Sequence, residues 1–212
     1  MTATFASDTG AMRFLALGDS YTIGEGVAES GRWPVQLAQA LRRNHRILVP
    51  EIVAQTGWTT DELADAMRQH TFHPPYALVT LLIGVNNQYR GRDVANYGDE
   101  FRRLLDRAIG LAGGRAARVM VVSIPDWGVT KFGRESGRDI AAIGRELDAY
   151  NAANAQIAAS MGARYVDIAG ISRDGGGAAE MLVADGLHPS AAMYRRWCDA
   201  ALPVAEQALA SE

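Results

Sequence analysis

A serine, a histidine and an aspartate in this chain have the types and spacing needed for hydrolysis by a nucleophilic serine. Ser20 follows a Gly-Asp pair at the end of a short apolar run, residues 13–17. Far along the chain, Asp185 stands three residues before His188, so one short loop can deliver both side chains. A serine hydroxyl is a weak nucleophile until a base takes its proton, and a carboxylate can hold that base in the right tautomer. The pattern predicts a catalytic triad of Ser20, His188 and Asp185.

The same chemistry needs hydrogen-bond donors for the negative oxygen that forms on the substrate carbonyl. The backbone N–H of Ser20 is available where the first apolar run ends. Gly57 follows a second apolar run, and a glycine there lets a ligand approach the backbone closely. Asn86 follows a third run and offers an uncharged side-chain N–H. We expect Ser20, Gly57 and Asn86 to form an oxyanion hole.

Five apolar runs rich in branched residues alternate with helical patterns and must position these groups. The runs cover residues 13–17, 47–54, 77–83, 118–124 and 164–168. The helical patterns cover residues 33–43, 96–111, 140–161 and 191–209, together with one that begins at a capping box, Thr-Thr-Asp-Glu, at 59–62. This alternation favours a mostly parallel sheet covered on both faces. The predicted fold is α/β, a three-layer α/β/α sandwich whose five-stranded sheet gathers the candidate residues at its carboxyl edge.

Length and composition predict one domain without a membrane span. The chain has 212 residues, 48% of them apolar and 21% charged, which is enough for one sizeable core. We expect residues 1–212 to form a single catalytic domain in which residues 1–11 are disordered. The first ten residues lack the basic start and apolar stretch of a secretory signal, which predicts a cytoplasmic protein unless an upstream signal has been removed.

Charge and motif content argue against nucleic acid, nucleotide cofactors and metals. The formal charge is -3 and no basic block could follow a phosphate backbone. Neither a complete dinucleotide fingerprint nor a phosphate-loop signature occurs, and the only cysteine, Cys198, provides no metal cluster. We therefore expect no cofactor, no stable membrane insertion and a small-molecule ester as substrate. The sequence is compatible with a monomer or a homodimer.

The segments that carry these residues resemble the four ordered blocks of the SGNH hydrolases, also called GDSL-type esterases and lipases. The blocks are Gly-Asp-Ser at 18–20 with Gly24, then Gly57, Gly-Val-Asn-Asn at 84–87 and Asp-Gly-Leu-His at 185–188. They span most of the chain in the family's order. The resemblance implies a flavodoxin-like sheet, no metal, and the triad and oxyanion roles given above. Two positions depart from the family's pattern, since Tyr21 replaces a usual leucine and Asn87 a usual aspartate.

The predicted reaction is hydrolysis of carboxylic esters with short acyl chains through an acyl-enzyme. Carbohydrate O-acetyl esterase, lysophospholipase and thioesterase activities are alternatives, because the resemblance does not choose among them. The irregular stretch 123–138 is long for a compact domain and is a candidate binding loop. Candidate substrate contacts are the residues beside the catalytic groups and the aromatic residues of that stretch: Tyr21, Ile23, Trp58, Asn87, Trp127 and Phe132.

Each of these residues also has a purely structural interpretation. A Gly-Asp-Ser triplet is commonly a turn, His188 beside a proline could be a surface residue, and a tryptophan can simply pack the core. The joint occurrence of the four blocks, each after an apolar run, favours the catalytic interpretation. Two further alternatives are a two-metal phosphoesterase, for which four histidines are few, and a noncatalytic binding module that keeps the fold.

Overall fold

Five parallel strands form the central sheet, in the spatial order β2-β1-β3-β4-β5. The computed structural model describes residues 10–210 of the chain. Its strands are β1 (Phe14–Gly18), β2 (Glu51–Ala54), β3 (Leu78–Leu82), β4 (Val119–Val122) and β5 (Arg164–Val166). In the shared register Leu17 lies between Val53 and Leu81. This order is that of the flavodoxin-like folds, so the predicted α/β sandwich is confirmed.

The central strands are apolar along their whole length because both of their faces are covered. All residues of β1, β3 and β4 are buried, whereas β2 and β5 at the two edges are only partly buried. Parallel sheets with helices on both faces have such continuous apolar strands.

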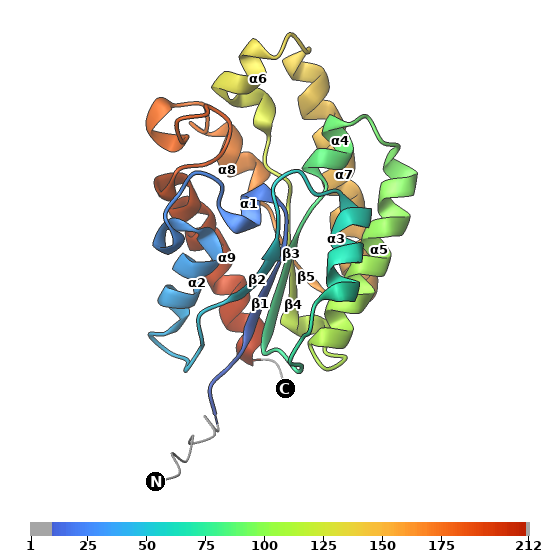
Figure 1. Cartoon of the computed structure of the whole chain (residues 1–212), viewed down its shortest axis with the longest axis vertical. Helices are drawn as coiled ribbons and strands as arrows, with labels where there is room; N and C mark the ends of the chain where they lie inside the picture. Colours follow the sequence, from blue (N-terminus) through green and yellow to red (C-terminus); the bar gives the residue numbers. More distant parts are fainter. Residues whose placement is uncertain (1–9, 211–212) are drawn as a thin grey trace.

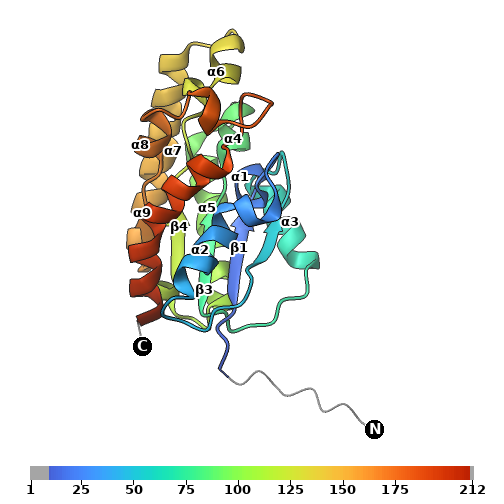
Figure 2. The ribbon, with the colours of Figure 1, turned by 90° about the vertical axis from the view of Figure 1, so that its left-hand side faces the viewer.

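Helices cover the two faces of the sheet (Figures 1 and 2). The helices are α1 (Ser20–Ile23), α2 (Trp33–Leu41), α3 (Thr60–Gln69), α4 (Val85–Tyr89), α5 (Val94–Leu111), α6 (Lys131–Glu135), α7 (Ile140–Met161), α8 (Ala169–Arg173) and α9 (Ala191–Ala210). The helix α9 packs with α2 on one face, and α5 packs with both α3 and α7 on the other. None of them is long and apolar enough to cross a membrane.

Local sequence signals set the ends of the longer helices. Asp139 caps α7 by accepting a hydrogen bond from the amide of Ala141 at 2.9 Å, and Gly162 ends the helix in the left-handed conformation. The capping box predicted at the start of α3 is present, with the Thr59 amide donating to Glu62 Oε2 at 2.8 Å. Strong caps of this kind explain why the predicted bounds of α7 agree with the structure.

Two of the predicted segments differ clearly from the structure. The strand expected over residues 47–54 is reduced to Glu51–Ala54, because Pro50 has no N–H for a ladder and Ile47 makes only an isolated bridge with Met12. The stretch 123–138, predicted to be a loop, contains a 3-10 helix at Trp127–Val129 and α6. Disorder was predicted for residues 1–11, most of which lie outside the described residues.

The strands that lead to candidate catalytic residues all end at the same edge of the sheet. The helix α1 starts two residues after β1 and α4 starts three residues after β3, so both begin at the carboxyl edge. In Figure 1 this edge lies at the top, beneath α6. The fold thus brings segments from most of the sequence to one place.

Candidate active site

Ser20 is the first residue of α1, directly beyond the end of β1. Asp19 caps this helix, because its Oδ1 accepts a hydrogen bond from the Tyr21 amide at 3.0 Å. A side chain at Gly18 would collide with the Leu82 carbonyl oxygen and the Thr22 hydroxyl, so the tight strand-to-helix turn requires glycine there. Asp19 is fully buried, and this burial raises the pKa of its carboxyl group to about 7.

Asp185 and His188 form a hydrogen-bonded unit within one loop. Asp185 Oδ2 lies 2.6 Å from His188 Nδ1, while Asp185 Oδ1 accepts hydrogen bonds from the amides of Leu187 and His188. Burial alone would raise the pKa of Asp185, but the hydrogen bonds from the His188 ring and the two amides outweigh it and hold the pKa below its ordinary value. The carboxylate therefore stays charged at neutral pH and orients the imidazole.

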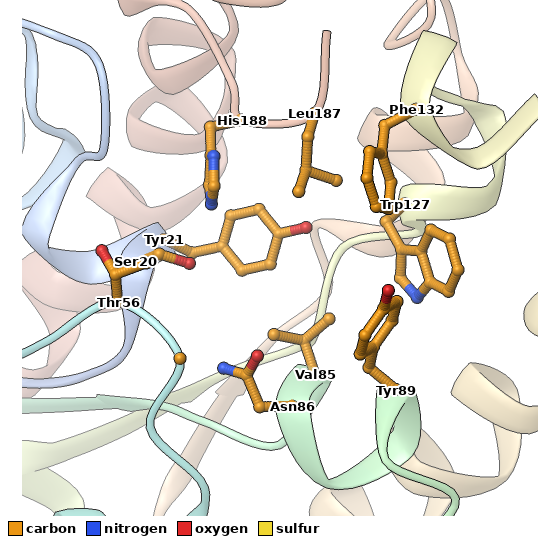
Figure 3. A pocket seen from close by; sticks show the side chains of 11 residues that line it. Ser20, Tyr21, Thr56, Val85, Asn86, Tyr89, Trp127, Phe132, Leu187 and His188 are labelled. Atoms are coloured by element: carbon orange, nitrogen blue, oxygen red, sulfur yellow. The ribbon is translucent and has the colours of Figure 1, made fainter. Parts of the chain in front are cut away.

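The His188 ring and Ser20 face the same pocket. Both residues line it, and Figure 3 shows the imidazole extending from its loop toward Ser20. The ring of Tyr21 supports the imidazole, with ring centroids 5.7 Å apart. The loop itself is held by two hydrogen bonds: the Val183 amide donates to the His188 carbonyl and the Phe132 amide donates to the Gly186 carbonyl, each at 2.9 Å. The structure thus brings together the three residues predicted as a triad.

The three predicted oxyanion donors have free N–H groups. Within residues 10–210 the backbone amides of Ser20 and Gly57 donate no hydrogen bond. The Asn86 amide nitrogen donates one of its hydrogens to the Trp58 carbonyl at 2.9 Å, which leaves the other for a ligand. Gly57 has a φ of +87°, and a side chain at this residue would be strained.

Arg90 holds the loop that carries Gly57, a role that the sequence did not indicate. Its guanidinium donates to the Gly57 carbonyl at 2.8 Å and also contacts Glu62 at the start of α3. Arg90 directly follows α4, the helix of Asn86. It therefore links the segments that carry two of the predicted oxyanion donors, which follow β2 and β3 on either side of β1.

The pocket has a volume of about 230 Å³ and is mostly apolar away from Ser20 and His188. Its far side, which we call the aromatic arm, consists of Tyr89, Trp127 and Phe132. Their ring centroids lie 5.4 to 6.5 Å apart. Trp127 is fixed by a hydrogen bond from its indole N–H to the Gln88 side chain at 2.9 Å. Figure 3 shows these rings opposite the catalytic groups, with Tyr21 between the two ends.

Three of the predicted substrate contacts do not line this pocket. Ile23 ends α1, and Trp58 contributes its carbonyl to Asn86 while its side chain packs against the core. Asn87 is fully buried, and both ends of its amide are bound to Thr60, so this side chain links α4 to α3. Its structural role explains its place beside Asn86, and no part of it is available to a ligand.

Four pocket residues were not identified from the sequence: Thr56, Val85, Tyr89 and Leu187. Val85 and Tyr89 lie four apart on α4, so they share a face, but a helix of five residues is too short to give a periodic signal. Thr56 and Leu187 adjoin predicted site residues, and this proximity was the only available signal. The described residues contain no group of three His, Cys, Asp or Glu side chains that could hold a metal ion.

Known structures resemble this chain in fold. No curated protein sequence matches closely enough to count as a relative. The solved structure of TesA has a TM-score of 0.73 and 20% identity, covering 93% of this chain and 100% of that one. The esterase EstA from Pseudoalteromonas, inhibited by monoethylphosphonate, has a TM-score of 0.67 and 17% identity, with 94% and 99% covered. A mutant of Axe2, an acetyl-xylooligosaccharide esterase from Geobacillus, has a TM-score of 0.69 and 20% identity, with 92% and 95% covered.

These structures share the fold with this chain. The sequence supplies the family, since residues 16–196 match the GDSL-like Lipase/Acylhydrolase family. The matched segment includes every residue of the predicted triad and oxyanion hole. The chain therefore belongs to the GDSL-like lipase/acylhydrolase family of hydrolases.

Proposed function

We propose that this hydrolase is a serine esterase that cleaves carboxylic esters with short acyl chains through an acyl-enzyme on Ser20. One observation carries the proposal: Ser20 and His188 line the same pocket, and Asp185 holds His188 at 2.6 Å. A nucleophile, a base and a group that orients the base are the parts that this chemistry requires.

In the first step, Ser20 Oγ attacks the ester carbonyl carbon while His188 Nε2 takes the hydroxyl proton. The carbonyl oxygen becomes negative and receives hydrogen bonds from the amides of Ser20 and Gly57 and from Asn86 Nδ2. The bond to the alcohol oxygen then breaks, and His188 gives its proton to that oxygen. The acyl group remains on Ser20 as the alcohol leaves.

In the second step, a water molecule takes the place of the alcohol. His188 removes a proton from this water as its oxygen attacks the acyl carbon. The bond to Ser20 Oγ breaks, His188 returns the proton to Oγ, and a carboxylic acid leaves. Asp185 stabilises the positive imidazolium in both steps, because its carboxylate is charged and fixed by two amides.

The size and lining of the pocket support short acyl chains. A volume of about 230 Å³ suits a small group, and the aromatic arm with Val85 and Leu187 offers it an apolar surface. A second candidate is the removal of acetyl groups from carbohydrate. The side chain of Tyr89 favours it, because this ring is half exposed at the pocket and could stack on a sugar.

The first test combines turnover with covalent labelling. We expect Ser20→Ala to lower kcat for p-nitrophenyl butyrate by roughly 10,000-fold or more, and to abolish labelling by a fluorophosphonate probe. Ser160→Ala, at an exposed serine of α7, is the matched control and should behave as wild type. Labelling of Ser20→Ala at the wild-type rate would contradict the proposal. Turnover of acetylated xylose oligomers above that of butyrate esters would favour the second candidate.

A further inference from the structure

The ring of Tyr21 separates the catalytic end of the pocket from its aromatic arm. Only 3% of this residue is exposed, yet it lines the pocket together with Ser20. Its ring packs against His188 and against Trp197 of α9, with centroids 5.7 and 6.0 Å apart. These contacts fix the ring, so the position of its hydroxyl group is fixed as well.

The hydroxyl group of Tyr21 has no hydrogen-bond partner among the described residues and lies among apolar side chains. It makes no hydrogen bond within residues 10–210, and Figure 3 shows it directed away from Ser20, toward Leu187, Phe132 and Trp127. Burial, followed by the charge of Asp19, raises the pKa of the Tyr21 phenol, so it remains a protonated donor. The hydroxyl oxygen is not closed off from the pocket, so an oxygen atom of a bound ligand can accept its hydrogen bond.

The acceptor side chains behind the Tyr21 ring already take part in other hydrogen bonds. A small hollow of about 20 Å³ on that side is lined by Asp126 and Ser172. Asp126 Oδ1 accepts from the Gly128 amide and Oδ2 from Arg173, while the Ser172 hydroxyl binds the Asp126 amide and the Ala169 carbonyl. Neither of these side chains accepts a hydrogen bond from the Tyr21 hydroxyl group, which leaves this donor for a ligand on the open side of the ring.

We propose that the Tyr21 hydroxyl group is a specificity determinant that donates a hydrogen bond to an oxygen atom within the acyl group of the substrate. The natural substrates are then esters of short, oxygen-bearing acids, such as ether, keto or hydroxy acids, rather than of plain alkyl acids. This inference rests on the proposed esterase function and narrows its substrate class.

The two-step reaction assigns the aromatic arm to the acyl group. The alcohol must leave and water must take its place while the acyl group remains bound to Ser20. A lined arm that holds its occupant suits the group that stays, and Tyr21 directs its hydroxyl into this arm. An alcohol group held as firmly there would leave more slowly and delay the entry of water.

A pair of matched esters tests the hydrogen bond. The p-nitrophenyl esters of pentanoic and β-methoxypropanoic acid differ only in one CH₂ replaced by oxygen, and hexanoic and γ-methoxybutanoic acid move the oxygen one position further. For each pair we compare the ratio of kcat/KM values, ether over alkyl, between wild type and Tyr21→Phe. Differences in the intrinsic reactivity of the esters cancel in this comparison.

We expect the ratio to be roughly 3- to 10-fold higher in wild type for at least one oxygen position, the gain of one hydrogen bond. Tyr165→Phe, at a partly buried tyrosine of β5 outside the pocket, should leave the ratio unchanged. Thermal unfolding of Tyr21→Phe checks that the variant is folded.

Two results would overturn the inference. One is a ratio within twofold between wild type and Tyr21→Phe at both oxygen positions. The other is a shift that appears only when the oxygen is moved to the alcohol side, for example in methoxyethyl against butyl acetate. Hydrolysis of pentanoate that depends on Ser20 would still support the esterase function in either case. If wild type cleaves none of these esters, the proposed function fails and takes this inference with it.

Discussion

The two ends of the pocket are built in different ways. At the catalytic end, short-range hydrogen bonds fix the groups: Asp185 lies three residues from His188, and Asp19 caps the helix that starts at Ser20. In the aromatic arm, long-range contacts fix the rings. Trp127 is bound to Gln88, and the Arg138 guanidinium lies 5.3 Å from the Trp127 ring centroid and 5.9 Å from that of Tyr89.

In the proposed mechanism, this difference separates the reaction from its specificity. The short-range catalytic end depends on a few residues whose loss removes a defined chemical step. The long-range arm depends on packing among segments that are far apart in sequence, so a change there alters which ester fits. We therefore expect substitutions at the catalytic end to lower turnover for every ester and those in the arm to change only the ranking of esters.

The largest effect is expected at the base. His188→Ala should lower kcat by roughly 100,000-fold for all esters, because neither half-reaction can then move its proton. Steady-state kinetics with p-nitrophenyl acetate and butyrate measure this. His73→Ala, at an exposed histidine, serves as the control. A loss confined to one ester would place His188 in substrate selection instead.

A smaller but still general effect is expected at the oxyanion hole. Asn86→Ala should lower kcat by roughly 100- to 1,000-fold with little change in KM, since the lost hydrogen bond strengthens in the transition state. Asn96→Ala, at an exposed asparagine of α5, is the matched control. An unchanged kcat, measured on folded protein, would remove Asn86 from the proposed mechanism.

The arm should respond selectively. Phe132→Ala removes one wall of the aromatic arm, so kcat/KM should fall by roughly 10-fold for pentanoate esters and by less than about 2-fold for acetate esters. The matched control is Phe72→Ala, which removes a partly buried phenylalanine that packs against Tyr76, away from the pocket. An equal loss for acetate and pentanoate after Phe132→Ala would contradict the division between the two ends.

The smallest effect concerns how Asp19, the residue before Ser20, changes the stability of the folded protein with pH. Burial raises the pKa of Asp19 from 3.8 to about 7, so between these values the folded state binds a proton that the unfolded state releases. Stability should therefore fall as the pH rises through this range, and the slope should be absent from Asp19→Asn. Over this pH range the unfolding temperature of wild type should fall by several degrees, whereas that of Asp19→Asn should not. The control is Asp106→Asn, at an exposed aspartate, which should behave as wild type. Parallel pH profiles for wild type and Asp19→Asn would contradict the assignment.

The contrast between the two ends also explains how much the sequence could predict. Asp139 and the glycine at 162 mark the ends of α7, and the five apolar runs indicate the sheet, because caps and continuous apolar strands are local signals. The short helices α1 and α4 were not predicted, since four or five residues carry no periodicity. The strand β2 was predicted to be longer than it is, because apolar residues also precede Pro50, before the strand begins.

The candidate site divides in the same way. The triad and oxyanion residues lie in short sequence motifs, so the sequence indicated them together, and their roles stay predictions until mutants are measured. Ser20, Gly57 and Asn86 follow strands closely, whereas Asp185 and His188 lie in the loop before α9. The aromatic arm could be predicted only in part. Trp127 and Phe132 were suggested by their place in a long irregular stretch, whereas Tyr89 and the guanidinium of Arg138 meet them only through tertiary packing. Asn87 was predicted as a substrate contact because it is adjacent to Asn86. The two side chains point in different directions, and that of Asn87 is buried against Thr60.

The acyl-enzyme itself gives the most direct test of the central claim, that Ser20 is the nucleophile. Wild-type protein is mixed with excess p-nitrophenyl butyrate, quenched in acid within the first turnovers, and analysed by intact mass and peptide mapping. We predict one butyryl group per chain, located on Ser20, and a burst of p-nitrophenol of matching size if the second step is the slower one. Ser20→Ala should show no adduct. Turnover by wild type with the butyryl group on another residue, or undiminished turnover by Ser20→Ala, would contradict the account.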